Sequence, residues 1–536
     1  MQQNKKQNLY LPLLLSVVLT IGLMIGIFLP SPQQPAGVTI YPRQSKIDQV
    51  LTYIREDYVD SVDIAHLEEV AIPAMLKELD PHSVYIPASE VAQVNEPLQG
   101  NFDGIGISFN MPDDTVIVMS VIHGGPSERV GIKAGDRIIK INDSLVAGQH
   151  IDQNDIVKML RGPRGTTVTV WVKRKGVADL LKFEITRDKI PLKSVDVAYM
   201  VTDSIGYIKI SKFARTTNEE FVRAFDRLMT SPIPPHKLIV DLRGNGGGYL
   251  DAAIHIADQF LPKGTLIVYT MGRNRKKDMV YAPGDGVFTD GDLVILIDEW
   301  SASASEIVAG AIQDNDRGTI IGRRSFGKGL VQEPFILRDG SVLRLTVARY
   351  YTPSGRCIQK PYDKGIEEYF NDINERFQKG EFESADSIHF PDSLKYKTVH
   401  GRTVYGGGGI MPDIFVPMDT SGISDYLIKV RNLGLIYRFA LAYTDQHREK
   451  LETFRTAAEL EQFLDQQPLL KDFIRYAEKK GVKPVGRDIQ RSRSILLTQI
   501  KAYIGRDVLD DDGFYPIIGK IDTTLQRAIR FLQTGK

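Results

Sequence analysis

Three closely spaced serines stand between a predicted strand and a predicted helix. Residues 293–298, LVILID, are rich in β-branched side chains and predict a short buried strand. Ser301, Ser303 and Ser305 follow it, and from Glu306 onward the apolar residues recur at helical spacing. A hydroxyl at this point lies near a helix N-terminus, where backbone N–H groups favour developing negative charge.

A lysine follows the next predicted strand. Residues 319–321 are apolar, and the chain then reaches Lys328 between two glycines. A serine near a lysine can act as a nucleophile whose proton the lysine accepts. Lys328 must then be neutral, which costs about 4.6 kcal/mol at pH 7 for a lysine of ordinary pKa. Burial between the apolar residues 319–321 and 330–331 is expected to lower the pKa of Lys328.

The same residues have plainer interpretations. Ser303 and Glu306 form the pattern S-x-x-E, and in most proteins such a serine only caps a helix. Residues 322–328 fit the phosphate-loop pattern G-x-x-x-x-G-K, but Gly329 stands where that motif needs serine or threonine, and no helix is predicted after it. A nucleotide site is therefore disfavoured. Lys328 could also be an ordinary solvated loop charge.

A glycine-rich turn lies upstream of the serines. Residues 237–248, KLIVDLRGNGGG, predict a buried strand that runs into this turn, and residues 250–261 predict a helix. Free N–H groups in the turn could form an oxyanion hole, although glycines also serve any tight turn. His255 lies on the predicted helix, and we expect it to be a packed or surface residue rather than a base.

Residues 98–190 predict a β-rich module with one late helix. The module resembles a PDZ domain. The resemblance rests on residues 131–142, GIKAGDRIIKIN, and on the loop formed by Gly104, Ile105, Gly106 and Ile107. Such a loop offers bare N–H groups to the C-terminal carboxylate of a peptide, which adds to an edge strand. The plainer alternative is a β module without a ligand.

The order of the motifs resembles the C-terminal processing (tail-specific) serine peptidase family. VDLRGNGGG, SASASEI and SFGKGLVQ follow the PDZ-like module, LDPHSVYI precedes it, and YYTPSGRCIQ and GGGGIMPDI come after the lysine. The resemblance covers about residues 47–417. Ser325 and Gly244 stand where the family often has threonine and asparagine. The resemblance implies an α/β, ClpP/crotonase-like peptidase core that uses no ATP, metal or organic cofactor.

The resemblance also implies a role for individual residues. Ser303 would be the nucleophile, Lys328 the general base and Gln332 the polar residue that orients the lysine. The oxyanion hole would use backbone N–H groups, those of Ala304 and of Gly247 or Gly248. The implied substrates are proteins whose C-terminal tails the PDZ domain recognises.

The length of 536 residues allows several domains. The 67 basic and 67 acidic residues balance, which argues against a nucleic-acid binder. A charged, irregular stretch at 364–398 is expected to be an inserted loop or lid. The expected division is a cytoplasmic tail (1–9), a transmembrane signal-anchor (10–30), an N-terminal helical segment (38–97), the PDZ domain (98–190), the peptidase core (191–420) and a C-terminal helical domain (421–536).

The N-terminus predicts a membrane anchor. Residues 11–29 carry no charge, and at about 1.5 Å per residue they nearly span a ~30 Å hydrocarbon core. Lys5 and Lys6 precede them and the next charge is Arg43, so the remaining chain is expected outside the cytoplasm. No A-x-A-like site follows, which favours an anchor over a cleaved signal peptide. The expected location is the inner membrane, single-pass, with the catalytic part in the periplasm.

The alternative function is a catalytically inactive PDZ scaffold on a peptidase-like core. The joint presence of Ser303, Lys328 and Gln332 argues against it. Residues 421–536 could cap the active site, dimerise or dock a partner, so a homo-oligomer and an activating partner both stay open.

Overall fold

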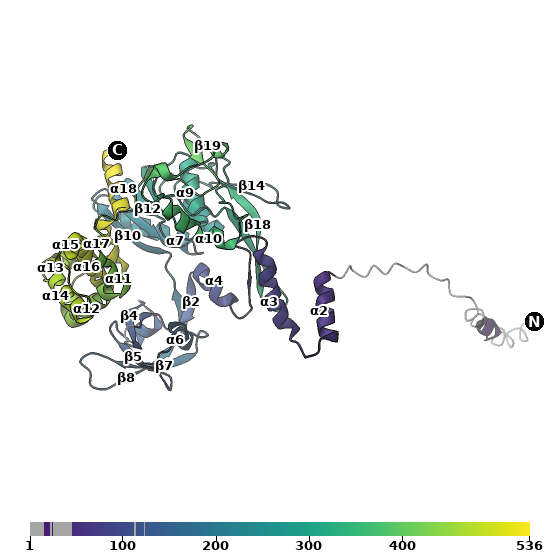
Figure 1. Ribbon diagram of the computed structural model, residues 1–536, viewed down its shortest axis with the longest axis horizontal. Coiled ribbons are helices and arrows are strands. Elements are labelled where there is room, and N and C mark those ends of the chain that lie inside the picture. Colours follow the sequence, from purple (N-terminus) through teal and green to yellow (C-terminus); the bar gives the residue numbers. More distant parts are fainter. Residues whose placement is uncertain (1–15, 22–23, 25–44, 112–113, 123, 536) are drawn as a thin grey trace, which may run out of the picture. The chain divides into compact units, whose positions relative to one another are not determined.

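The structure is a computed structural model that describes residues 16–21, 24, 45–111, 114–122 and 124–535 (Figure 1). It comprises two compact units, Met1–Ile72 and Pro73–Lys536. The predicted anchor at 10–30 lies largely outside the described residues. Among the helices that are described, none is both long enough and apolar enough to cross a membrane.

Two predicted helices near the N-terminus are confirmed as α2 (Lys46–Asp57) and α3 (Ile64–Lys77). Ser45 caps α2 and Asp48 completes a capping box, which satisfies N–H groups at the helix start. Further along the chain come a short strand, β1 (Val84–Ile86), and α4 (Val91–Gln99).

The PDZ-like module is a six-stranded antiparallel sheet in the order β3-β4-β5-β7-β8, with β6 paired to β5. The predicted late helix is confirmed as α6. A separate pair, β2 with β9, joins the two ends of the module. The bounds are β2 (Asn101–Gly104), β3 (Ile107–Asn110), β4 (Val116–Val121), α5 (Pro126–Arg129), β5 (Arg137–Ile141), β6 (Ser144–Leu145), α6 (Gln153–Leu160), β7 (Thr167–Lys173), β8 (Leu181–Thr186) and β9 (Asp188–Pro191).

The peptidase core is built on a six-stranded sheet in the order β10-β11-β12-β15-β16-β21. The first pair is antiparallel and the others are parallel. Its strands are continuous apolar runs because both faces are covered. The bounds are β10 (Val195–Thr202), β11 (Ile205–Ile210), β12 (Lys237–Asp241), β15 (Asp292–Ile297), β16 (Thr319–Gly322) and β21 (Ile414–Phe415).

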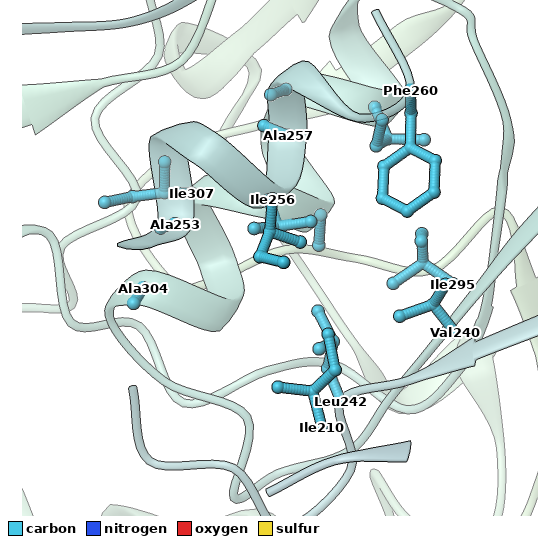
Figure 2. Close-up of a cluster of buried hydrophobic side chains, with 14 of the residues drawn as sticks. Ile210, Val240, Leu242, Ala253, Ile256, Ala257, Phe260, Ile295, Ala304 and Ile307 are labelled. Carbon is cyan, nitrogen blue, oxygen red and sulfur yellow. The ribbon is translucent and has the colours of Figure 1, made fainter. Parts of the chain in front are cut away.

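Three helices follow strands of this sheet, namely α7 (Thr217–Met229), α8 (Leu250–Asp258) and α9 (Ala304–Asp314). Figure 2 shows how α8 and α9 pack on one face of the sheet. Ile256 of α8 and Ile307 of α9 lie in the same buried cluster as Val240 and Ile295 of the strands. This packing fixes the N-terminal end of α9, where the serines lie.

A second sheet contains β1, β18, β13 and β14 in that order, with β17 also paired to β18. The antiparallel pairing of β17 with β18 forms a hairpin about Asp339 and Gly340. The bounds are β13 (Leu266–Met271), β14 (Asp278–Tyr281), β17 (Leu330–Ile336) and β18 (Val342–Tyr351). Lys328 lies two residues before the start of β17, so this hairpin helps to determine where the lysine lies.

The stretch 364–398 is less irregular than the sequence interpretation held. It contains a 13-residue helix, α10 (Ile366–Gln378), followed by two short 3-10 turns and β19 (Lys395–Lys397), which pairs with β20 (Thr403–Tyr405). Tyr369 is buried, and its ring contacts His82 and Phe326 edge-on. The high charge of the segment obscured the helical spacing of its aromatic residues.

The C-terminal region is helical, as predicted. The bounds are α11 (Asp425–Asn432), α12 (Leu435–Leu451), α13 (Ala457–Asp465), α14 (Leu469–Lys479), α15 (Gly486–Arg491), α16 (Arg493–Leu509), α17 (Asp511–Ile518) and α18 (Thr523–Thr534). Helices α11–α16 share one apolar cluster, whereas Leu525, Ala528 and Leu532 of α18 belong to the cluster that covers the other face of the core sheet. Asp522 caps α18 and pairs through both carboxylate oxygens with Arg243, at 2.8 and 2.6 Å.

Candidate active site

Ser303 occupies a strained position at the start of α9. It follows β15 and forms the N-cap of the helix, with φ 57° and ψ −113°. A positive φ is costly for any residue with a side chain, by about 1–3 kcal/mol, and persists only where the surroundings enforce it. Ala302 and Ala304 on either side are buried, whereas Ser303 is partly exposed. The turn therefore presents the serine at the surface of an otherwise closed segment.

Glu306 connects the serine turn to the lysine loop. It is fully buried, and its Oε2 accepts hydrogen bonds from the N–H groups of Ser303 and Lys328, each at 2.8 Å. Its Oε1 accepts from the Ser325 hydroxyl at 2.5 Å and from the Gly327 N–H at 2.7 Å. Burial raises the pKa of Glu306, and the four hydrogen bonds oppose that rise.

This role goes beyond the helix cap that the S-x-x-E pattern indicates. The N–H of Glu306 donates to the backbone oxygen of Ser303 at 2.9 Å, so that N–H has an acceptor without the serine hydroxyl. The carboxylate meanwhile reaches past its own helix to the loop at 325–328. The S-x-x-E pattern therefore marks a helix start and also the carboxylate that binds both the serine turn and the lysine loop.

Tyr350 of β18 makes a second connection between the two segments. Its buried hydroxyl donates to the backbone oxygen of Lys328 at 2.7 Å and lies 3.1 Å from the backbone oxygen of Ser303. The structure thus brings Ser303 and Lys328 together through backbone groups on both sides.

Lys328 is partly buried, and its pKa is lowered to about 8. Burial is the largest cause and the positive charge of Arg344 is the second, whereas Glu306 and Asp80 act in the opposite direction. A lysine with this pKa loses its proton at pH 7 for about 1.4 kcal/mol, instead of about 4.6 kcal/mol for an ordinary lysine. The apolar sequence around Lys328 predicts its burial, whereas the contribution of Arg344 follows only from the structure.

Gln332 lies on β17, four residues after Lys328 in the chain. Its amide nitrogen is 3.5 Å from the Thr346 hydroxyl, at the limit of a hydrogen bond, and Thr346 is its cross-strand partner on β18. Among the described residues the structure gives Gln332 no hydrogen bond to Lys328.

The glycine-rich turn packs directly against the serine. A Cβ atom on Gly247 would lie 2.8 Å from both the backbone oxygen of Ala302 and the Cβ of Ser303, so only glycine fits there. The N–H of Gly247 donates to Asn245 Oδ1 at 2.9 Å. In the part of the chain that the structure describes, no acceptor lies in range of the N–H groups of Gly248 and Ala304.

The loop expected to bind a carboxylate connects β2 to β3. Gly104 ends β2 and Ile107 begins β3. The backbone oxygens of Ile105 and Gly106 accept hydrogen bonds from Ser127 and Ile122, at 3.0 and 2.9 Å. Strand β3 is the edge of its sheet, with β4 as its neighbour. The loop therefore leads into a strand with one free side, as peptide addition requires.

Family models match several parts of the chain. The family model of peptidase family S41 matches residues 204–370, and that of the PDZ domain matches residues 104–185. A family of unknown function matches residues 426–510, within the C-terminal helices.

Named relatives extend over more of the chain. The carboxy-terminal-processing protease of Bartonella bacilliformis is 41% identical over 323 residues, which are 60% of this chain and 73% of that protein. The carboxy-terminal processing protease CtpB of Bacillus subtilis is 36% identical over 60% of this chain and 66% of that protein.

Two solved structures are also similar. The photosystem II D1 C-terminal processing protease is 25% identical, with a TM-score of 0.37 over 70% of this chain and 87% of that one. The PDZ domain of a Vibrio cholerae carboxy-terminal protease, solved with a peptide, is 32% identical, with a TM-score of 0.16 over 17% of this chain and 99% of that one.

Fold and family matches together define a peptide hydrolase that carries a PDZ domain. The chain belongs to the carboxy-terminal processing protease family, within peptidase family S41.

The first prediction concerns Glu306. Glu306→Gln replaces one accepting oxygen by an NH₂ group, which would face two donors. We expect a loss of about 1–3 kcal/mol in the free energy of unfolding and at least a tenfold fall in peptide hydrolysis. Urea denaturation and a hydrolysis assay measure the two effects. Glu367→Gln, on the exposed face of α10, is the matched control. Equal behaviour of the two variants would contradict the connecting role of Glu306.

Proposed function

We propose that this protein hydrolyses peptide bonds with a Ser303–Lys328 dyad. The observation that carries the proposal is the double connection through Glu306 and Tyr350, which holds the serine turn and the lysine loop together. The lowered pKa of Lys328, about 8, supports its role as the base, since about a tenth of such lysines are neutral at pH 7.

The reaction would proceed in two halves. Ser303 Oγ attacks the scissile carbonyl carbon while Lys328 Nζ takes the hydroxyl proton, which gives a tetrahedral oxyanion. The intermediate collapses as Lys328 returns that proton to the departing amine nitrogen, and the acyl group remains on Ser303. Water then attacks the ester with Lys328 again as base, and the carboxylic acid and the free serine are released.

The oxyanion would be bound by two backbone N–H groups. Ala304 supplies one, at the N-terminus of α9, where the helix dipole also favours negative charge. We assign the other to Gly248, because the N–H of Gly247 is already bound to Asn245. Gln332 would offer Lys328 a neutral hydrogen-bond partner, which does not favour the charged form as a carboxylate would.

The second prediction tests the dyad. Ser303→Ala and Lys328→Ala are each expected to reduce hydrolysis by at least about a thousandfold while the fold persists. The full chain in detergent is incubated with an unfolded protein that ends in an apolar tail, with a chelator present and ATP absent. The wild-type rate should rise with pH to a midpoint near 8, because Lys328 must lose its proton.

Ser204→Ala and Lys364→Ala change exposed residues of the same types and serve as controls. Full activity in either dyad variant would refute the assignment. An inactive wild-type protein that still binds the tail would favour the alternative, a PDZ scaffold.

We further propose that the PDZ domain recognises the C-terminal tails of substrates. The Gly104–Ile107 loop would bind the carboxylate, and the tail would pair with β3 as an additional strand. The Ser303→Ala protein is therefore expected to bind a peptide with a free C-terminus at least about tenfold more tightly than its amidated twin. Fluorescence polarisation measures both affinities, and equal affinities would refute carboxylate recognition.

We also propose that residues 10–30 anchor the chain in the inner membrane with the catalytic part in the periplasm. The uncharged run at 11–29 behind Lys5 and Lys6 supports this location. The full chain is expected to stay in the membrane pellet after an alkaline wash, whereas a chain that begins at Gln33 should be released. Release of both would refute the anchor.

A further inference from the structure

The motif LDPHSVYI forms a tight turn around a buried carboxylate. Asp80 Oδ1 accepts hydrogen bonds from the N–H groups of His82 and Ser83, at 2.8 and 2.9 Å. Asp80 Oδ2 accepts from the Ser83 hydroxyl at 2.5 Å. Asp80 and Ser83 are both buried. The turn is therefore a rigid unit, and neither the fold nor the proposed dyad explains why it centres on a carboxylate.

The turn is held against β18, the strand that also pairs with β17. β1 follows the turn and pairs with β18 from Val84 opposite Arg344 to Ile86 opposite Val342. The N–H of Thr346 donates to the Ser83 hydroxyl at 3.1 Å. The Thr346 hydroxyl donates to Asp80 Oδ1 at 3.0 Å. The backbone N–H and the side-chain hydroxyl of Thr346 therefore both bind to the turn.

This contact determines how Thr346 can interact with Gln332. A threonine hydroxyl has a single proton, and in Thr346 that proton goes to Asp80. The oxygen can then only accept from Gln332, whose amide nitrogen lies 3.5 Å away. The NH₂ end of the amide is thereby directed to Thr346, and its oxygen is left to accept a hydrogen bond. A lysine amine that donates to this oxygen keeps its lone pair for the serine proton.

We propose that Asp80 is a positioning residue that acts through Thr346 on the amide of Gln332, and thereby on Lys328. The proposal rests on the Ser303–Lys328 dyad, which it deepens. Asp80 itself would touch neither the substrate nor the reacting atoms.

Asp80 also contributes a charge. The charged groups that act on Lys328 are Arg344, which lowers its pKa, and Glu306 and Asp80, which raise it, in addition to burial. His82, in the same turn, is neutral, because burial first and Lys328 second lower its pKa to about 3. Asp80 therefore has two separable effects, since it orients the amide and holds the pKa of Lys328 up. A purely structural residue would have neither signature.

The test compares two substitutions of the same threonine in the full chain. Thr346→Val keeps the shape but removes the hydroxyl, whereas Thr346→Ser keeps the hydroxyl. We expect Thr346→Val to lower kcat at least tenfold with the pH midpoint still near 8, because the Asp80 charge remains. Thr346→Ser should stay within about threefold of wild type. Equal kcat in the two variants, whether high or low, would overturn the proposal.

Asp80→Asn adds a second readout. Removal of the negative charge should lower kcat and also move the midpoint of the pH profile to lower pH, because Asp80 raises the pKa of Lys328. A midpoint that stays or moves upward would overturn the proposal. Lys328→Ala distinguishes a failure of the dyad from a failure of the role proposed for Asp80. If it stays active, the dyad itself is wrong, whereas an inactive Lys328→Ala beside a normal Thr346→Val refutes only the role of Asp80.

Discussion

The active-site geometry depends on one buried carboxylate with four donors. Glu306 is placed by α9, yet its oxygens bind backbone groups of both the serine turn and the lysine loop. A buried carboxylate without partners would cost several kcal/mol, so the surrounding donors cannot move apart without that penalty. The two segments are 22 residues apart in the chain, from Glu306 to Lys328, and this interaction makes them one rigid site.

The same region balances opposite electrostatic effects on the lysine. Burial and Arg344 favour the neutral amine, while the carboxylates of Asp80 and Glu306 favour the charged one. Of these two carboxylates Glu306 has the larger effect on the pKa of Lys328. The resulting pKa of about 8 lies close to physiological pH, which suits the proton transfer in both directions that the proposed dyad requires.

Local patterns in the sequence were sufficient to predict most of the elements. The strand before Ser303 and the helix after it both lie where the apolar spacing predicted them. The hydrogen bonds of Tyr350 and the effects of Arg344 and Asp80 on Lys328 could not be predicted, since they depend on the pairings of β18 with β1 and β17. The choice of Gly248 rather than Gly247 for the proposed oxyanion hole likewise required the structure, in which the N–H of Gly247 donates to Asn245.

The helix at 366–378 shows the limit of composition as a guide. Five of its 13 residues are charged, yet its buried tyrosine packs on the turn that contains His82. The charged residues of α10 belong to its solvent-facing side, whereas its other side contacts the region of the candidate active site. The spacing of the apolar residues indicates this helix, whereas the overall composition of the segment does not.

The position of α18 has a consequence for the timing of synthesis. Its apolar side chains cover one face of the core sheet, and Asp522 binds the arginine next to the glycine-rich turn. These residues leave the ribosome after every strand of that sheet. A nascent chain therefore carries Ser303, Lys328 and the glycine-rich turn before α18 can cover this face of the sheet, and the face closes only when translation has passed residue 532.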